Sequence, residues 1–589
     1  MTVEPSAFGR LIRRVEDLRR REDQLALVLS LLIGALVGLV VVAFILLTGR
    51  LAARMYPPGG SGWRRVIVPT LGSLVTGYLL YRYFPLARGS GIPQTKAALF
   101  IQDGRISFRT VLGKFFCCSA SLASGIALGR EGPAVQIGAG LASVIARRLR
   151  MSRDQVKALV PVGGAAALAA AFNTPIAAVL FSLEEIMGDL HAPILGSVVL
   201  SSATAWMVLH LVLGDEPLFH VTAYHLVNPI EFVAYAVLGV VGGLGSVAFV
   251  KLLLRLRQWF LDQPPRTQWI QPVAGGLTVG IMGYFLPEIL GVGYGQVERA
   301  LAGDMLLRTV VLLAVLKIIA TAVCYASGNA GGIFGPSLFI GAMMGASVGS
   351  VAHLLFPAST AGPGAYALVG MGTAFAGIVR TPLTSVFMIF EVTRDYTIIV
   401  PLMISNLIAF FISQRLQHQP IYEALARQDG VHLPTDEHRI ARARLRVTTA
   451  MRQAADEILS PRTSVADALS HAAVSPLEAW PVVDGTELQG MVERRELERA
   501  LADGRGDQPL TELLRTRPSP HRADALALPH VHPDHSLTLA LERMGTLRHT
   551  VLPVVSRSNI RHLLGVVTLE DVLGAYGVDR PRASEDDHD

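Results

Sequence analysis

The segment Gly129-Arg130-Glu131-Gly132-Pro133 places a carboxylate inside a long apolar stretch, at the expected start of a helix. Ionisable groups at membrane depth are costly, so a charge in such a position indicates a functional role. A helix N-terminus attracts anions, because its first backbone N–H groups lack partners and the helix dipole is positive there. Glu131 can therefore act as the anion itself, and it can be displaced by another anion or neutralised by a proton.

The apolar character of this segment extends over most of the chain. Of the 589 residues, 51% are hydrophobic and 17% are charged, which is too apolar for an ordinary soluble enzyme. Apolar segments follow one another from residue 25 to residue 415, and several are short and interrupted by Gly or Pro. Irregular backbone at membrane depth persists only where protein buries it or where it lines a cavity. This pattern predicts a polytopic membrane protein with broken helices around a transport pathway.

A cluster of arginines precedes the first apolar span, which covers residues 25–48. By the positive-inside rule, this cluster predicts that the N-terminal segment, residues 1–24, is cytoplasmic. The net charge of +6 does not indicate nucleic-acid binding, because the arginines adjoin a membrane span. The arginines of the cluster are Arg10, Arg13, Arg14, Arg19, Arg20 and Arg21.

The region around Glu131 recurs about 200 residues later in the chain. Residues 129–139 and 332–342 share the pattern Gly-x-x-Gly-Pro-x-x-x-Ile-Gly-Ala. In each copy a Thr-Pro pair follows, with a glutamate ten residues after the threonine: Glu184 in the first copy and Glu391 in the second. These matches predict a duplicated membrane domain with its site at the interface of the repeats.

Three turns rich in Gly and Pro punctuate the membrane part: Gly89-Ser90-Gly91-Ile92-Pro93, residues 129–133 and Gly332-Ile333-Phe334-Gly335-Pro336. Each places Pro where a helix begins and Gly where backbone must approach closely. Three helix N-termini that converge would bind an anion through backbone N–H groups, without a fixed cation that would trap it. The Ser90 hydroxyl would add a donor.

Together, the three turns resemble those of the CLC family of chloride channels and chloride/proton antiporters. The resemblance covers residues 25–425. It implies an all-α polytopic membrane fold with inverted repeats and broken helices. It also implies a homodimer in the lipid bilayer, with a separate anion pathway in each subunit.

The resemblance also implies roles for individual residues. Glu131 would be the external gating glutamate that accepts protons. Tyr422 follows the last apolar segment and would be an interfacial aromatic anchor if considered alone, but it matches the anion-coordinating tyrosine of the family. The chloride-binding residues implied in this way are Ser90, Gly91, Ile92, Ile333, Phe334 and Tyr422.

Glu185 bears on the choice between an antiporter and a channel. It matches the internal proton-transfer glutamate of CLC antiporters, where channels of the family commonly carry an apolar residue. The alternative for Glu185 alone is an exposed glutamate at a helix end. The prediction is a chloride/proton antiporter, and a passive chloride channel of the voltage-gated type is the alternative. The resemblance also implies chloride rather than nitrate, because family members tuned to nitrate tend to carry Pro at the position of Ser90. Lys96 departs from some bacterial antiporters and looks more like eukaryotic members.

Residues 447–578 predict a soluble α/β unit that follows a linker at residues 426–446. Trp480-Pro481-Val482-Val483 and Leu552-Pro553-Val554-Val555 each lead to a second short apolar segment and then to a helix. This repeat resembles a pair of cystathionine-β-synthase (CBS) domains, at residues 447–505 and 525–578.

Pairs of CBS domains often bind adenine nucleotides, so the resemblance implies a cytoplasmic regulatory unit that can bind ATP, ADP or AMP. Thr568 and Asp571 match the ribose-binding pattern of the family, and the Asp571 carboxylate can accept hydrogen bonds from ribose hydroxyls. The first copy carries Glu493 and Glu496 there and departs from the pattern. A plain N-cap pair remains the alternative for Thr568 and Asp571.

The remaining expectations concern enzyme activity, metals and cofactors, and the location of the protein. Residues 345–349 match the Gly-x-Ser-x-Gly pattern of hydrolases but lie in an apolar helix, so no enzyme activity is expected. The three cysteines have no metal-ligand spacing, and neither a metal nor a required cofactor is expected. We expect both termini in the cytoplasm, a bacterial inner membrane, and a disordered acidic tail at residues 579–589.

Overall fold

The computed structural model describes two compact units, Met1–Leu433 and Pro434–Asp589. The predicted tail at 579–589 and much of the predicted linker at 426–446 lie outside the described residues, as do the first six residues of the chain. The described residues are 7–57, 59–190, 194–215, 217–219, 227–433, 445–453, 457–475, 477–515, 529–547 and 549–577.

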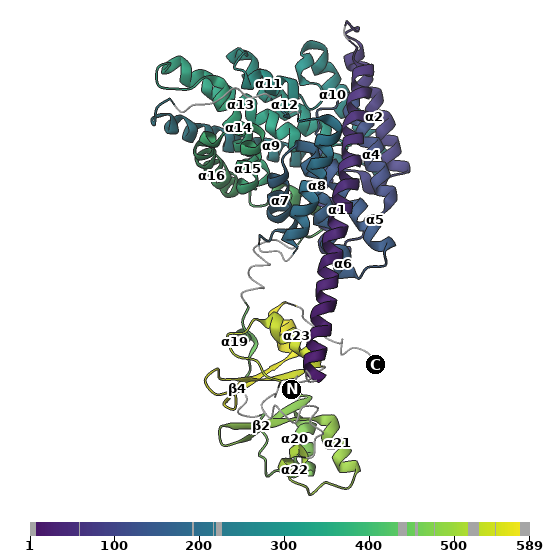
Figure 1. Cartoon of the computed structure of the whole chain (residues 1–589), viewed down its shortest axis with the longest axis vertical. Coiled ribbons are helices and arrows are strands. Elements are labelled where there is room, and N and C mark those ends of the chain that lie inside the picture. Colours follow the sequence, from purple (N-terminus) through teal and green to yellow (C-terminus); the bar gives the residue numbers. More distant parts are fainter. Residues whose placement is uncertain are drawn as a thin grey trace, which may run out of the picture. The chain divides into compact units, whose positions relative to one another are not determined.

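The first unit is built from helices, shown from purple to green in Figure 1. Within the described residues, seven helices are long and apolar enough to cross a membrane, and several others are short or broken. The protein is therefore a multi-pass membrane protein of the predicted fold class. Its helices are α1 (Ala7–Met55), α2 (Arg64–Arg82), α3 (Ile92–Phe100), α4 (Phe108–Ala123), α5 (Glu131–Arg148), α6 (Arg153–Phe172), α7 (Pro175–Phe181), α8 (Leu195–Leu213), α9 (Glu231–Leu261), α10 (Gln271–Phe285), α11 (Tyr294–Leu301), α12 (Leu307–Ala326), α13 (Phe334–Leu355), α14 (Pro363–Val379), α15 (Pro382–Thr393), α16 (Ile399–Leu416) and α17 (Ile421–Gln428).

Helix α1 joins two segments that the sequence analysis treated separately. The arginine-rich segment and the first apolar span form one helix from Ala7 to Met55. Residues 10–24 contain six Arg, two Leu and two Glu residues, all good helix formers, and no proline, so nothing in the sequence ends a helix there.

Local sequence signals start and end the shorter helices. Ser107 caps α4 by accepting a hydrogen bond from the Thr110 N–H, at 3.1 Å. Helix α6 ends at Asn173 with φ 61°, and α14 ends at Arg380 with φ 69°. Each of these left-handed residues is followed by a Thr-Pro pair that starts the next helix, α7 or α15. The predicted duplication is thus visible in the helix boundaries.

The two copies of the repeat are joined by a reciprocal backbone bridge. The Gly129 N–H donates to the Gly332 carbonyl at 2.7 Å, and the Gly332 N–H donates to the Gly129 carbonyl at 2.8 Å. Helices α5 and α13 both begin two residues after this bridge. The bridge therefore brings the second and third turns together at the interface of the repeats.

The glutamates found by their spacing cap helices of the opposite repeat. Glu184 accepts hydrogen bonds from the N–H groups of Leu383 (3.3 Å) and Thr384 (2.9 Å), at the start of α15. Glu391 accepts in the same way from Ile176 (2.8 Å) and Ala177 (2.7 Å), at the start of α7. Each copy of the repeat makes the same contact with the other copy. Such reciprocal contacts are typical of a two-fold interface.

The second unit contains two antiparallel strand pairs of the same construction. Strand β1 (Ala479–Asp484) pairs with β2 (Glu487–Glu493), and β3 (Val551–Val555) pairs with β4 (Leu563–Thr568). The first strand of each pair is bridged in parallel by an upstream segment, at Leu459 in one copy and at Val531 in the other. This confirms the predicted α/β repeat. The helices of the unit are α19 (Val447–Ala450), α20 (Val465–Val474), α21 (Arg494–Ala502), α22 (Leu510–Arg515), α23 (Leu537–Leu547) and α24 (Leu569–Ala575).

We expect Glu184→Ala and Glu391→Ala each to destabilise the membrane unit by about 1–3 kcal/mol, because each leaves two helix N–H groups without an acceptor. Thermal melting of the purified full chain in detergent measures this loss. Asp304→Ala, at an exposed position after α11, is the matched control. An unchanged melting temperature in both glutamate variants would contradict the capping role.

Candidate functional site

Three helix N-termini meet at the interface of the repeats. The start of α3 contacts the start of α5 so closely that a methyl group at Gly91 would overlap the Gly132 carbonyl. Gly91 also has φ 105°, a conformation that only glycine adopts readily. A methyl group on Gly332, before α13, would lie 3.3 Å from the Gly132 nitrogen. The three predicted turns therefore converge.

The Glu131 carboxylate occupies the position that an anion would take at the start of α13. It is fully buried, and its Oε2 accepts a hydrogen bond from the Gly335 N–H at 3.2 Å. Its Oε1 accepts a hydrogen bond from the Tyr294 hydroxyl. The Arg130 Nε lies 4.0 Å from Oε1, and its guanidinium stands over the Tyr294 ring. The carboxylate is thus held by donors from the opposite repeat.

The sequence analysis did not identify Tyr294. This residue begins α11, and the segment Gly291-Val292-Gly293-Tyr294 occupies the position in the second repeat that Gly89-Ser90-Gly91-Ile92 occupies in the first. Extending the repeat to the first turn would have found this correspondence. It would not have shown that the Tyr294 hydroxyl reaches Glu131, because that contact depends on the packing of α11.

Two hydroxyl groups next to the converging turns lack ordinary partners. Ser90 and Tyr422 are both fully buried, and their side chains interact. Neither hydroxyl oxygen makes a hydrogen bond of normal geometry within the part of the chain that the structure describes. A buried hydroxyl without a hydrogen bond of normal geometry is unfavourable, so both hydroxyls are suited to donate to a ligand. The structure therefore brings Ser90 and Tyr422 together, as an anion site requires.

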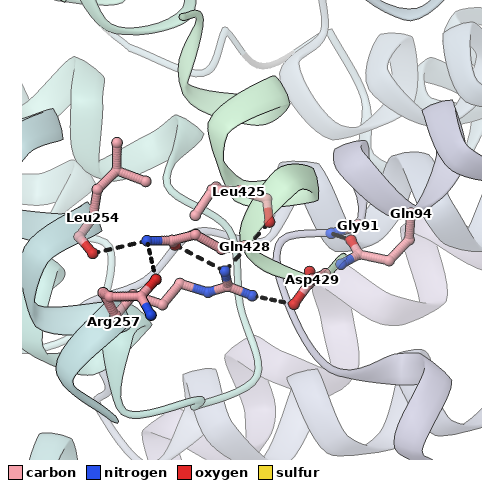
Figure 2. A network of polar contacts seen from close by, with 8 residues as sticks. Gly91, Gln94, Leu254, Arg257, Leu425, Gln428 and Asp429 are labelled. Atoms are coloured by element: carbon pink, nitrogen blue, oxygen red, sulfur yellow. Dashed lines mark hydrogen bonds and ion pairs between the residues drawn. The ribbon is translucent and has the colours of Figure 1, made fainter. Parts of the chain in front are cut away.

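The other predicted anion-site residues contribute backbone rather than side chains. Ile333 and Phe334 lie at the start of α13, where N–H groups have no partner within the helix. Ile92 holds the same place in α3, whereas the Gly91 N–H donates to the Gln94 side chain at 2.9 Å (Figure 2). The Phe334 ring packs against Phe375, with centroids 4.3 Å apart. Of the first turn, Ile92 and the Ser90 hydroxyl are thus the available donors.

Buried lysines support the loops before α3 and α11. The Lys114 ammonium donates to the carbonyls of Ala87 (2.9 Å) and Gly89 (2.7 Å). The Lys317 ammonium donates to Ile289 (3.1 Å) and Gly291 (2.6 Å) in the second repeat. Both lysines were missed by the sequence analysis, although each is a charge in an apolar segment. They hold the carbonyls of the loops that precede α3 and α11.

An arginine clamp positions the helix that carries Tyr422. Arg257 on α9 donates to Gln428 (2.9 Å) and to Asp429 (2.5 Å), at the end of α17. Gln428 in turn donates to the Leu254 carbonyl at 3.0 Å, and Figure 2 shows these contacts together. The clamp ties α17 to α9 and so sets the position of the Tyr422 hydroxyl.

A cavity of about 410 Å³ lies beside the first turn. Gly89, Pro93 and Gln94 line it, so it reaches the backbone next to Ser90. Its wall carries more cations than anions, which favours the approach of an anion. The charged residues of the wall are Arg88, Arg105, Arg257 and Asp429.

Glu184 and Glu185 are adjacent in sequence, but their side chains have different partners. Both belong to a π-helical turn, Ser182–Met187, that continues α7. Glu184 is turned to the start of α15, whereas Glu185 is buried and pairs with the Lys96 ammonium at 2.7 Å. The alternative of an exposed glutamate at a helix end is therefore wrong for Glu185, because the π turn directs it toward α3.

In the second unit, Thr568 and Asp571 form the N-cap of α24. The Asp571 N–H donates to the Thr568 hydroxyl oxygen at 3.1 Å, and the Thr568 N–H donates to the carboxylate at 3.2 Å. Asp571 also pairs with Arg452 at 2.5 Å, and this hydrogen-bonded carboxylate raises the pKa of Arg452. In the first copy, Glu493 pairs with His549 at 2.8 Å. A ribose would have to share Asp571 with Arg452.

Comparison with known proteins agrees with the predicted fold and family. Residues 71–414 match the voltage gated chloride channel family, and residues 525–577 match the CBS domain. The chain belongs to the voltage-gated chloride channel (CLC) family. The CBS match covers the second copy of the soluble repeat.

Individual relatives of this CLC protein are named as transporters or channels. It is 34% identical to the putative chloride channel protein ClcB-like of Ralstonia nicotianae, over 63% of this chain and 88% of that protein. It is 32% identical to the H(+)/Cl(-) exchange transporter ClcA of Salmonella arizonae, over 72% of this chain and 93% of that protein. The crystal structure of a slow cyanobacterial Cl-/H+ antiporter matches 70% of this chain and 99% of its own, with 26% identity and a TM-score of 0.64.

We expect Tyr294→Phe to strengthen chloride binding to this CLC protein on the order of tenfold. Loss of a hydrogen bond to a charged group weakens the hold on the Glu131 carboxylate, so chloride competes with it more easily. Isothermal titration calorimetry with chloride measures the effect. Tyr396→Phe, at a residue 77% exposed, is the control. The gain should vanish in Glu131→Gln protein, and its persistence there would contradict the role of Tyr294.

Proposed function

We propose that this protein is a chloride/proton antiporter. The observation that carries the proposal is the Glu131 carboxylate, which stands at the N-terminus of α13 on the Gly335 N–H, beside the buried hydroxyls of Ser90 and Tyr422. One anion position is thus filled by a group that can be neutralised by a proton. The relatives named as H(+)/Cl(-) exchange transporters and the similarity to a Cl-/H+ antiporter support the same function.

Exchange follows from competition for that position. Chloride entering the site displaces the Glu131 carboxylate, which then loses the Gly335 donor. A carboxylate removed from its donors and kept away from water binds a proton more readily. Proton binding in turn leaves the anion position free for chloride. The two ligands therefore couple, and thermodynamic coupling acts equally in both directions.

Glu185 is proposed as the internal proton-transfer residue. It is buried, and its charge acts on Tyr422, as does the charge of Glu131, so the hydroxyl of Tyr422 lies within the electrostatic reach of both carboxylates. The alternative function is a passive chloride channel, and channels of the family commonly carry an apolar residue at this position. The ClcB-like relative is named as a channel, so the experiment described below also tests this alternative.

The remaining parts of the proposal concern the assembly and its setting. We propose that two copies form a homodimer in a bacterial inner membrane, with both termini in the cytoplasm. The arginine cluster before the apolar part of α1 supports a cytoplasmic N-terminus. The bacterial relatives support the choice of membrane.

Proteoliposomes with a chloride gradient and a pH readout test the exchange. We expect chloride to drive protons uphill in the wild type. Glu131→Gln should abolish proton movement and retain chloride flux, and Glu185→Val should lower proton movement on the order of 10²-fold, as the loss of a positioned proton carrier does. Asp304→Asn is the control. Chloride flux without uphill proton movement in the wild type would leave the passive channel as the function.

We further propose that the CBS pair binds an adenine nucleotide and regulates transport. Support comes from Asp571, a carboxylate at the start of α24 in the copy that matches the CBS domain. Arg452 would leave Asp571 when ribose binds, and its guanidinium would then be available to phosphate oxygens.

ATP binding to the full chain, measured by equilibrium dialysis, tests this part. We expect Asp571→Ala to weaken binding about tenfold, because ribose loses a charged acceptor. Asp534→Ala removes a different carboxylate, which pairs with Arg557 at 2.6 Å on an exposed surface, and should leave binding unchanged. Equal ATP binding by wild type and Asp571→Ala would rule out Asp571 as the ribose ligand.

A further inference from the structure

The ion pair between Lys96 and Glu185 is buried within the membrane unit. The Lys96 ammonium and the Glu185 carboxylate are 2.7 Å apart, with 9% of the lysine and 5% of the glutamate exposed. Lys96 belongs to α3 and Glu185 to the π turn after α7, so the pair joins two elements 89 residues apart in sequence. The sequence analysis noted Lys96 only as a departure from some bacterial relatives.

Stability alone does not account for this pair. Removing two charges from water is costly, and replacing a buried ion pair with packed apolar residues is often neutral or stabilising. An ionisable group at membrane depth is by default a functional one. The pair therefore requires a role in addition to packing.

Helix α3 connects this pair to the anion site. Its first residue, Ile92, follows the Ser90 hydroxyl and the Gly91 turn, and Lys96 lies one helical turn further along. The helix packs against α17, which carries Tyr422, through Ala97 and Ala426. A nine-residue helix thus presents its N-terminus to the anion and a cation to Glu185.

Charged groups of the described residues reach Glu185 from the elements packed against its π turn. The π turn packs against α3, α6 and α7, of which α7 has no ionisable residue. On α6 the charges lie in its first two turns, where Lys157 pairs with Asp103 at 2.9 Å. Glu184, on the same turn, is directed to α15. Within the described residues, Lys96 of α3 pairs with Glu185, and the charge of Glu185 acts on Tyr422 of α17. The charged residues of α6, which are Arg153, Asp154 and Lys157, lie at the far end of that helix.

We propose that Lys96 is a positioning residue that couples protonation of Glu185 to chloride binding at the start of α3. While Glu185 is ionised, its carboxylate neutralises the Lys96 ammonium. When Glu185 takes up a proton from the aqueous side, it becomes a neutral acid and Lys96 stays an ammonium. The site gains one positive charge, which is no longer compensated and attracts chloride to Ser90. This inference rests on the proposed function and adds a second coupling to that of Glu131.

Chloride affinity against pH tests the coupling, measured by isothermal titration calorimetry on the full chain. All variants carry Glu131→Gln, because titration of Glu131 would otherwise change chloride affinity with pH. In this background we expect acidification to tighten chloride binding about fivefold or more, the size of a typical coupling between sites. Adding Lys96→Met should remove this pH dependence, and adding Lys96→Arg should retain it.

Glu185→Gln in the same background imitates the protonated acid and leaves Lys96 in place. It should bind chloride tightly at every pH, which keeps the proposal testable if Lys96→Met does not fold. Lys157→Met, which removes a lysine paired with Asp103, is the matched control and should keep the pH dependence.

Two results would overturn the inference: an unchanged pH dependence in Lys96→Met, or chloride affinity in Glu185→Gln no tighter than in its parent at neutral pH. Either result would be compatible with uphill proton transport by the wild type, and so would reject only the role of Lys96. If the wild type showed no uphill proton transport, the proposed antiporter function itself would be rejected.

Discussion

The pair of backbone hydrogen bonds between Gly129 and Gly332 is the constraint on which the site depends. Two segments about 200 residues apart are joined by N–H and carbonyl groups alone, and a side chain on either glycine would crowd the neighbouring turn. Within a membrane each of these polar groups must find a partner in the protein, since lipid offers none. Pairing the two turns satisfies them and, at the same time, brings the N-termini of α5 and α13 together. The bridge therefore sets side by side two helix starts whose first N–H groups have no partner within their own helix.

The two repeats differ at the first residue of helices α5 and α13. Phe334 begins α13 and supplies a ring packed against Phe375, whereas Glu131 begins α5 and supplies a charge. The charge is held by donors of the opposite repeat, Gly335 and Tyr294. A symmetric scaffold thus holds an asymmetric pair, in which the start of α13 donates an N–H group and the start of α5 supplies the carboxylate that accepts it. The same asymmetry appears at the neighbouring glutamates, where Glu184 and Glu391 are equivalent caps and only the first has an acidic neighbour, Glu185.

Much of this arrangement could be predicted from the sequence, because short turns have strong local requirements. Gly and Pro at fixed spacing specify a helix start, and their recurrence predicted the duplication. The resemblance of the three turns predicted the family, which the comparisons confirm. The spacing of Glu184 and Glu391 marked them as equivalent positions of the repeat, and the two make equivalent helix caps. The sequence analysis treated the polar segment and the first apolar span separately, whereas the structure has one helix, α1, through both. The reason is that helix propensity continues from one segment into the other. Tyr294, Lys114 and Lys317 were missed, since each acts on a loop or a carboxylate brought to it only by packing.

The sequence by itself determined the membrane class, the repeat, the three turns and the soluble α/β pair, since these follow from hydropathy and from the backbone preferences of Gly and Pro. Only the tertiary structure decided which charges meet. Glu185 could have been an exposed residue at a helix end, and it is instead buried against Lys96 because a π turn redirects it toward α3. Asp571 fits a ribose-binding pattern, yet its carboxylate is already paired with Arg452. Both outcomes depend on long-range contacts between side chains, and the energy of such a contact varies with a few ångströms of separation that no local pattern encodes.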